Sequence, residues 1–103
     1  MKMEKIKDIY DKLPAGEVIL DVRTPEEYAE GHVPGSINIP HEEVTQHLDE
    51  LKKYSVVHIH CRSGGRAGKA MAVLTNAGLT NLHCIDDSGM MHWMEKGYPV
   101  ETK

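Results

Sequence analysis

The sequence predicts an α/β domain in which helices cover both faces of a mainly parallel sheet. Short apolar runs that suit buried strands alternate with stretches of helical periodicity. Parallel strands need a crossover between them, and a helix is the usual crossover. The 103 residues are enough for one compact core and too few for two, so a single domain over residues 1–103 is expected.

The first strand and helix are predicted to follow each other directly. Val18–Val22 is an apolar run typical of a buried strand. Thr24 can cap the next helix, Pro25 fits its first position, and Glu27 stands where it completes a capping box. Before the strand, residues 5–13 suit either an amphipathic helical turn or a short leading strand.

An edge strand and a second helix come next. Ser36–Ile39 is short and alternating and has prolines on both sides, which suits the edge of a sheet. A helix is predicted from about Glu42 to Leu51, because its apolar residues Val44, Leu48 and Leu51 fall on one face.

The second half of the chain repeats the order of strand and helix. The apolar run Val56–His60 predicts a strand, and a loop then leads into a helix that begins near Ala67 and is ended by Gly78. A short strand at Leu82–Ile85 and a last helix over Met90–Lys96 complete the prediction.

Cys61 is the best candidate for chemistry, because it stands at the turn between a predicted strand and the helix after it. Gly64 and Gly65 let the backbone curl so that successive N–H groups converge on one point. The helix N-terminus, Arg62 and Arg66 add positive potential there. Such a site favours the thiolate, which is the nucleophilic form of cysteine.

Three loops are expected to form the walls of one pocket. In parallel α/β sheets, ligands bind where loops leave the carboxyl ends of the strands. Cys61 follows one strand, and the segments from Asp21 to Arg23 and from Asp86 through Ser88 to Gly89 follow two others. Asp21 and Arg23 can touch substrate, although an ion pair between them that fixes the loop is the favoured interpretation.

Composition and charge narrow the classes of partner. The formal net charge is −4 and only three of the twelve basic residues are arginine, which argues against a nucleic-acid face or a membrane-surface patch. Small anions or protein partners fit better. Two cysteines make no disulfide scaffold, no apolar stretch approaches the ~20 residues of a membrane span, and the start lacks a signal-peptide core. A cytoplasmic location is therefore expected.

The remaining cysteine and histidines are given structural roles. Cys84 lies within a predicted strand, so a place in the core is favoured over a role as resolving thiol. His58 and His60 would share one face of their strand, which supplies two metal ligands at most. No metal and no organic cofactor is expected. His32 is interpreted as a turn residue rather than a general base.

Three segments together resemble the rhodanese family of sulfurtransferases. They are Asp21–Tyr28 with Gly31–Pro40, then Cys61–Arg66, then Gly89–Val100, and their order and spacing look like those of a single-domain member. The resemblance implies a three-layer rhodanese-like fold around a mainly parallel sheet of about five strands.

By this resemblance, Cys61 takes a sulfane sulfur from a donor such as thiosulfate, holds it as a persulfide and passes it to cyanide or a thiol. Backbone N–H groups of residues 62–66 would stabilise the terminal persulfide anion. Arg62 and Arg66 would hold the sulfonate end of the donor, because a guanidinium donates to oxyanions in a fixed fork, and Ser63 would add a hydrogen bond.

The length of the cysteine loop favours this activity over phosphate chemistry. The six residues from Cys61 to Arg66 resemble the sulfur-transferring branch, whereas the related phosphatases and arsenate reductases have one residue more. The chain departs from many members at two points, with Ser88-Gly89 in place of two glycines and His60 in place of a tyrosine.

Two other functions remain open beside a thiosulfate sulfurtransferase. The same loop would suit a non-enzymatic module that carries or senses persulfide sulfur for a partner protein. A third hypothesis is redox-regulated protein binding through the methionine-rich segment Met90–Met94.

Overall fold

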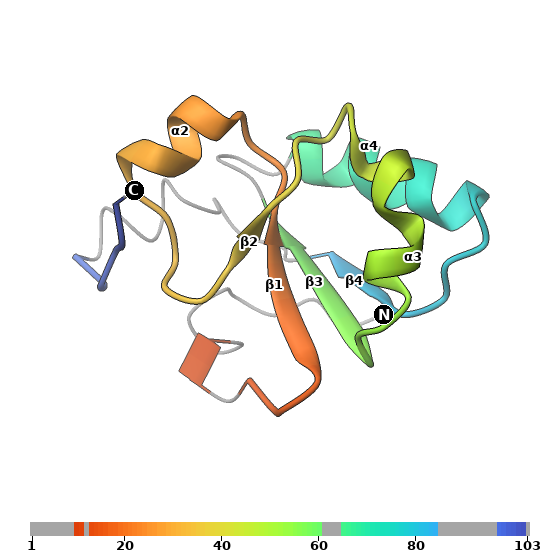
Figure 1. Cartoon of the computed structure of the whole chain (residues 1–103), viewed down its shortest axis with the longest axis horizontal. Coiled ribbons are helices and arrows are strands. Elements are labelled where there is room, and N and C mark those ends of the chain that lie inside the picture. The colour runs from red at the N-terminus through yellow and green to blue at the C-terminus, as the bar shows by residue number, and fades with distance from the viewer. Residues whose placement is uncertain (1–9, 12, 61–64, 85–96, 103) are drawn as a thin grey trace.

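Strands and helices alternate along the chain, as the sequence predicts. A computed structural model describes residues 10–11, 13–60, 65–84 and 97–102 (Figure 1). Its strands are β1 (Glu17–Asp21), β2 (Ile37–Asn38), β3 (Val56–His60) and β4 (Leu82–Cys84). Its helices are α2 (Pro25–Glu30), the 3-10 helix η1 (Val44–His47), α3 (Leu48–Leu51) and α4 (Gly65–Asn76).

The described strands form one parallel sheet in the order β2-β1-β3-β4. The β1 and β3 strands pair along their full length, from Glu17 opposite Val56 to Asp21 opposite His60. The predicted edge strand is confirmed, because β2 pairs with β1 alone. Because β1 and β3 are parallel neighbours, their carboxyl ends lie side by side at the same end of the sheet.

The expected number of strands is wrong for the described residues, which form four strands instead of about five. Tyr10 and Asp11 have helical backbone, so they do not supply the alternative leading strand. Near the other end of the chain, Glu101 makes a single antiparallel bridge with His32, which is too short to count as a strand. The α/β class and the mainly parallel sheet are as predicted.

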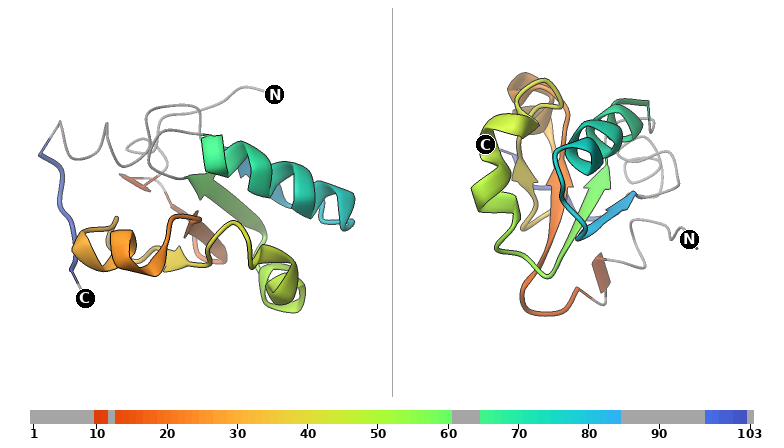
Figure 2. Two further views of the ribbon diagram at one scale, coloured as in Figure 1. Left: turned by 90° about the horizontal axis from the view of Figure 1, so that it is seen from above. Right: turned by 90° about the vertical axis from the view of Figure 1, so that its right-hand side faces the viewer.

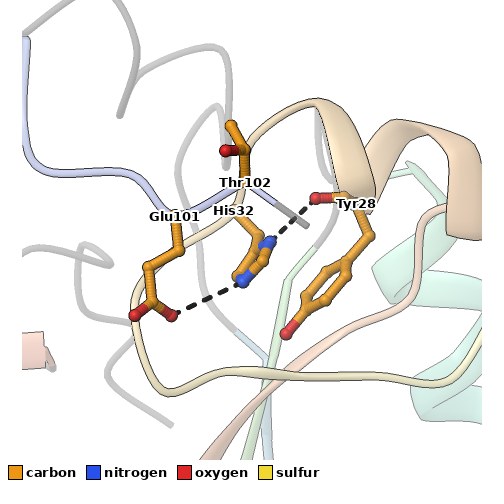
Figure 3. A pocket seen from close by; sticks show the side chains of 4 residues that line it. All are labelled: Tyr28, His32, Glu101 and Thr102. Atoms are coloured by element: carbon orange, nitrogen blue, oxygen red, sulfur yellow. Dashed lines mark hydrogen bonds and ion pairs between the residues drawn. The ribbon is translucent and has the colours of Figure 1, made fainter.

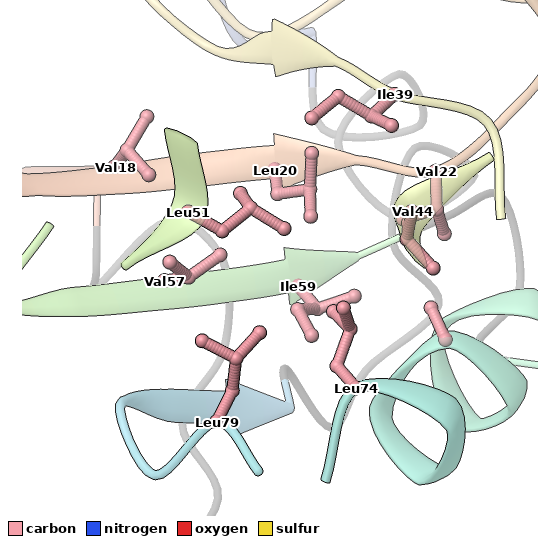
Figure 4. Close-up of a cluster of buried hydrophobic side chains, with 11 residues drawn as sticks. Val18, Leu20, Val22, Ile39, Val44, Leu51, Val57, Ile59, Leu74 and Leu79 are labelled. Atoms are coloured by element: carbon pink, nitrogen blue, oxygen red, sulfur yellow. The ribbon is translucent and has the colours of Figure 1, made fainter. Parts of the chain in front are cut away.

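The larger hydrophobic core lies on the face of the sheet that α3 and α4 cover. Alternate residues of β1 and β3 point into it, and Leu51 of α3 and Leu74 of α4 meet them with no exposed surface (Figure 4). In the left view of Figure 2, α3 and most of α4 lie to the right of β1 and β2. This packing fixes where α4 begins relative to the end of β3.

The opposite face of the sheet carries a smaller apolar cluster and several polar side chains. Ile19 and Val33 are buried there against Tyr10, Leu13 and Tyr98. His58 is opposite Ile19 and His60 is opposite Asp21, so the two histidines share this face as the strand pattern predicts.

A chain of hydrogen bonds on that face joins three neighbouring strands. One ring nitrogen of His58, Nε2, is 2.8 Å from Glu17 Oε1, and the other, Nδ1, is 3.0 Å from Nδ1 of His83. His58 is 9% exposed. Its polar ring atoms are therefore satisfied by partners inside the sheet, as buried polar groups require.

The predicted capping box starts α2. The hydroxyl oxygen of Thr24 accepts from the Glu27 backbone N–H at 3.2 Å, and the Glu27 carboxylate accepts from the Thr24 backbone N–H at 3.1 Å. Pro25 takes the first helical position, and Gly31 follows the last residue of the helix. This short helix is thus defined by its own local sequence.

The predicted helix over residues 42–51 is wrong as a single element. It is divided into η1 and α3, with the break at His47, whose φ of −121° and ψ of 26° are not helical. Neither part has a side-chain cap at its start. The predicted apolar face is nevertheless present, because Val44 and Leu51 are buried and Leu48 packs against the same core.

The other predicted elements are placed as follows. The helix expected near Ala67 begins two residues earlier, at Gly65, and Gly78 follows its end with a φ of +99°, which favours glycine. The helix expected over residues 90–96 lies outside the described residues, as do most of residues 5–13. In the part of the chain that the structure describes, no helix is both long and apolar enough to cross a membrane.

Candidate functional site

The candidate site is the connection between β3 and α4. β3 ends at His60 and α4 begins at Gly65, so the four residues between them join a central strand to a helix N-terminus. Those four residues, Cys61, Arg62, Ser63 and Gly64, lie outside the described part of the chain. Ser88 and Gly89, expected in the pocket wall, lie outside it as well.

The start of α4 is suited to an anion. Gly65 and Arg66 lie in its first turn, and no acidic residue lies in that turn. The first N–H groups of a helix have no partner within the helix, and the aligned peptide dipoles make this end positive. α4 has 12 residues and is anchored by Ala70 and Leu74, which are fully buried. Its N-terminus is therefore a fixed positive end directly after the cysteine segment.

The ion pair expected between Asp21 and Arg23 is present and buried. Asp21 is 0% exposed and Arg23 is 5% exposed. Arg23 Nη2 lies 2.7 Å from Asp21 Oδ2, and Nε lies 3.0 Å from both carboxylate oxygens. The Arg23 backbone N–H also donates to Oδ1 at 3.0 Å. The carboxylate is thus held by both the side chain and the backbone of Arg23.

The Arg23 guanidinium also reaches the far end of α2. Nη2 donates to the carbonyl oxygen of Gly31 at 2.8 Å, so one arginine ties the start of the loop after β1 to the residue that follows α2. With Nε and Nη2 engaged in this way, Arg23 stabilises the loop rather than presenting these donors to a ligand. This arrangement fits the ion-pair interpretation of Asp21 and Arg23.

His60 connects the ion pair with the cysteine segment. Its side chain is 1% exposed, and its Nε2 lies 3.8 Å from Asp21 Oδ2. Its carbonyl oxygen accepts from the Val22 backbone N–H at 3.0 Å. The residue directly before Cys61 is therefore anchored to the loop after β1 through its backbone, and its ring lies beside the Asp21 carboxylate.

Asn38, which the sequence pattern places only as a strand residue, makes two contacts that this pattern does not predict. Asn38 Nδ2 donates to the carbonyl oxygens of Asp21 and Arg23, each at 3.0 Å. The available signal was an asparagine in a strand, a residue type that is depleted there and that needs partners for its amide when half-buried.

A hollow on another part of the surface is lined by Tyr28, His32, Glu101 and Thr102 (Figure 3). The His32 ring stacks on the Tyr28 ring with centroids 3.6 Å apart. His32 Nδ1 donates to the Tyr28 carbonyl oxygen at 2.8 Å, and Nε2 lies 3.6 Å from Glu101 Oε1. These contacts hold the segment around Glu101 against the end of α2, and they agree with a structural role for His32.

Metal-ligating side chains do not gather in the described residues. No group of three or more histidine, cysteine, aspartate or glutamate side chains there is arranged to hold a metal ion. Cys84 lies in β4 opposite Ile59, within the sheet.

Comparison with known proteins supports one family. Residues 5–96 match the family model of the rhodanese-like domain. The thiosulfate sulfurtransferase 16 of Arabidopsis thaliana, a chloroplastic protein, is 35% identical over 108 residues that cover 90% of this chain and 87% of the relative. The thiosulfate sulfurtransferase PspE of Escherichia coli is 37% identical over 70 residues, covering 66% of this chain and 67% of the relative.

A solved structure agrees over the full length. A rhodanese-related protein from Thermoplasma volcanium has a TM-score of 0.82 and 30% identity, and the match covers 100% of both chains. Together with the sheet order and the strand-to-helix connection at Cys61, these matches show that the chain belongs to the rhodanese family of sulfurtransferases.

Proposed function

We propose that this chain is a thiosulfate sulfurtransferase that works through a persulfide on Cys61. The observation that carries the proposal is the position of the cysteine in the topology. In the sequence it follows β3, a central strand of a parallel sheet, and precedes α4, and parallel sheets bind their ligands where loops leave the carboxyl ends of such strands. Membership of the rhodanese family supports sulfur as the group transferred.

The first half-reaction moves one sulfur atom to the enzyme. The Cys61 thiolate attacks the outer sulfur of thiosulfate, and a new sulfur–sulfur bond forms. The original sulfur–sulfur bond of thiosulfate breaks, and sulfite leaves with its electron pair. The products are a Cys61 persulfide anion and sulfite, so charge and atoms balance without an added oxidant or reductant.

The second half-reaction returns the enzyme to its starting state. Cyanide attacks the terminal sulfur of the persulfide, and a carbon–sulfur bond forms. The sulfur–sulfur bond to Cys61 breaks, thiocyanate leaves, and the electron pair of the broken bond stays on Cys61 as its thiolate. A thiol acceptor, small or carried by a protein, would attack the same sulfur and take it away as a persulfide. Neither step requires a metal or an organic cofactor.

We assign roles to the groups around Cys61 from the negative charge that they would have to stabilise in each step. The terminal persulfide anion needs hydrogen-bond donors, and we assign this role to backbone N–H groups of residues 62–66, which run into the start of α4. Arg62 and Arg66 would bind the sulfonate oxygens of thiosulfate.

The supporting residues are assigned to the wall of the pocket. Asp21 and Arg23 hold the loop after β1 through their buried ion pair, and Ser88 and Gly89 would form the wall on the β4 side. A reducing compartment such as the cytoplasm suits a reaction that depends on a free thiolate.

Intact-mass spectrometry after exposure to thiosulfate tests the assignment of the nucleophile. The parent chain should gain the mass of one sulfur atom, mapped by peptide analysis to Cys61, and cyanide should remove it as thiocyanate. Cys61→Ser should gain nothing and keep its fold by circular dichroism. Cys84→Ser is the matched control, and it should gain the sulfur as the parent does.

Steady-state kinetics separates the enzyme from the alternatives. Repeated formation of thiocyanate from thiosulfate and cyanide supports the sulfurtransferase, whereas one sulfur per chain without turnover, across several acceptors, supports a carrier module. Parental turnover by Cys61→Ser would show that the nucleophile is assigned wrongly.

A further inference from the structure

The side-chain amide of Asn38 bridges two carbonyl groups in the loop that follows β1. Asn38 is the last residue of β2, and its Nδ2 donates to the carbonyl oxygens of Asp21 and Arg23 at 3.0 Å each. These two oxygens belong to the residues on either side of Val22. The amide therefore fixes the backbone both before and after Val22.

Val22 in turn holds the end of β3. Its N–H donates to the carbonyl oxygen of His60 at 3.0 Å, and its own carbonyl oxygen accepts from the His41 N–H at 3.0 Å. His60 directly precedes Cys61 in the sequence. A shift of the Val22 backbone would thus move the point from which the cysteine segment leaves the sheet.

The buried ion pair between Asp21 and Arg23 restrains the same three residues, 21–23, through bonds made by side chains. Asp21 Oδ1 accepts from both the backbone N–H and the Nε of Arg23, at 3.0 Å in each case. Val22 between them is 0% exposed. Residues 21–23 are therefore restrained by side-chain bonds within the loop and by the Asn38 amide from the neighbouring strand.

From these contacts we infer that Asn38 is a positioning residue for sulfur transfer, and that it acts on Cys61 through Val22 and His60. The inference rests on the proposed function, because it takes Cys61 as the nucleophile. It assigns to Asn38 no contact with substrate. Misplacing a reacting group by roughly 1 Å costs on the order of 100-fold in rate, so even a small shift at Val22 should be measurable.

Asn81 supplies a matched control within the same chain. It too is half-buried, and its Nδ2 donates to two carbonyl oxygens, those of Leu51 at 3.0 Å and Tyr54 at 2.8 Å. Asn81 directly precedes β4 at the amino end of the sheet, where its carbonyl oxygen accepts from the Val57 N–H. Replacing it removes the same kind of bridge at the opposite end of the sheet from His60, the residue that precedes Cys61 in the sequence.

The experiment compares Asn38→Ala with Asn81→Ala in the full chain. Unfolding in urea gives the stability of each variant, and kcat and KM for thiosulfate with cyanide give its activity. The rate at which iodoacetamide alkylates Cys61, measured by peptide mass spectrometry apart from Cys84, gives its thiol reactivity. If Asn38→Ala does not fold, Asn38→Ser, which keeps one donor, takes its place.

We expect both variants to lose stability but only the Asn38 variant to lose activity. Its kcat should fall by about 10- to 100-fold and its Cys61 alkylation rate should change, while Asn81→Ala stays within about twofold of the parent in both. Equal kcat in the two variants would overturn the inference.

The two proposals can fail separately. If the parent itself transfers no sulfur, the proposed function is wrong, and the alkylation comparison still decides the positioning role. A changed Cys61 alkylation rate in the Asn38 variant alone would then support that role, and equal rates in the two variants would exclude it.

Discussion

Removing one partner of the Asp21–Arg23 pair should destabilise the fold far more than removing both. Arg23→Met takes away the guanidinium and leaves the Asp21 carboxylate, which is 0% exposed, without its ionic partner. The same change removes the bond from Nη2 to the Gly31 carbonyl oxygen. Asp21→Asn combined with Arg23→Met leaves no buried charge in the loop.

The burial of the ion pair sets the loss of unfolding free energy that we expect for Arg23→Met. Exposed ion pairs contribute about 0–1 kcal/mol, but this pair is almost fully buried, and breaking a buried pair costs about 3–5 kcal/mol. A domain of this size is stable by roughly 5–15 kcal/mol, so Arg23→Met should lose a large part of the total. The double variant should lose less than Arg23→Met alone, because no unpaired charge remains buried.

Equilibrium unfolding in urea, followed by circular dichroism for the parent, Arg23→Met, Asp21→Asn and the double variant, gives the coupling between the two residues. A loss below about 1 kcal/mol for Arg23→Met would show that the pair behaves as an exposed one. A double variant whose loss equals the sum of the two single losses would show that the residues do not interact, and either result would refute the reasoning from burial.

Three further predictions concern the cap, the core and the loop. Thr24→Ala should cost about 0.5–2 kcal/mol in urea unfolding, because it removes the hydroxyl that caps α2; an unchanged free energy of unfolding would contradict this. Leu74→Ala should cost about 2–5 kcal/mol in the same assay, whereas Val73→Ala, 41% exposed on the same helix, should change it by less than about 1 kcal/mol; equal losses would argue against the core as described. Arg66→Gln should lower kcat/KM for thiosulfate by about 10- to 100-fold, while Lys69→Gln, exposed one turn later in α4, should match the parent; equal effects would count against a specific contact with the donor.

Local sequence signals were sufficient to predict an element where one short segment determines its own structure. The capping box of Thr24 and Glu27 placed α2, and the prolines around Ser36–Ile39 placed β2 at the edge of the sheet. Over residues 42–51, the spacing of apolar residues identified the buried face but not the break at His47. Helical periodicity reports which side of a segment is buried, and a 3-10 turn followed by an α turn can bury the same side.

Contacts between distant segments could be predicted only where the topology implied them. The ion pair between Asp21 and Arg23 could be predicted because the two residues lie close together in the sequence at the end of one predicted strand. The bridge from Asn38 to the same loop depends on the register of β2 against β1, in which Asn38 lies opposite Asp21. That register is a property of the assembled sheet, and the composition of a two-residue strand does not encode it.

The order of the strands in the sheet also constrains the sequence of events by which the chain can fold. β1, which lies second in the sheet, has its longest pairing with β3, and 34 residues of sequence separate Asp21 from Val56. A nascent chain that has not yet exposed β3 outside the ribosome cannot complete this pairing, and the apolar side chains of Val18 and Leu20 lack their neighbours until then. Every described strand pair is parallel, so none of the described strands can start the sheet as a hairpin. Pairing of β1 with β3 therefore waits until residues 56–60 are available, and because it closes a long loop it should be a slow, high-contact-order step of folding.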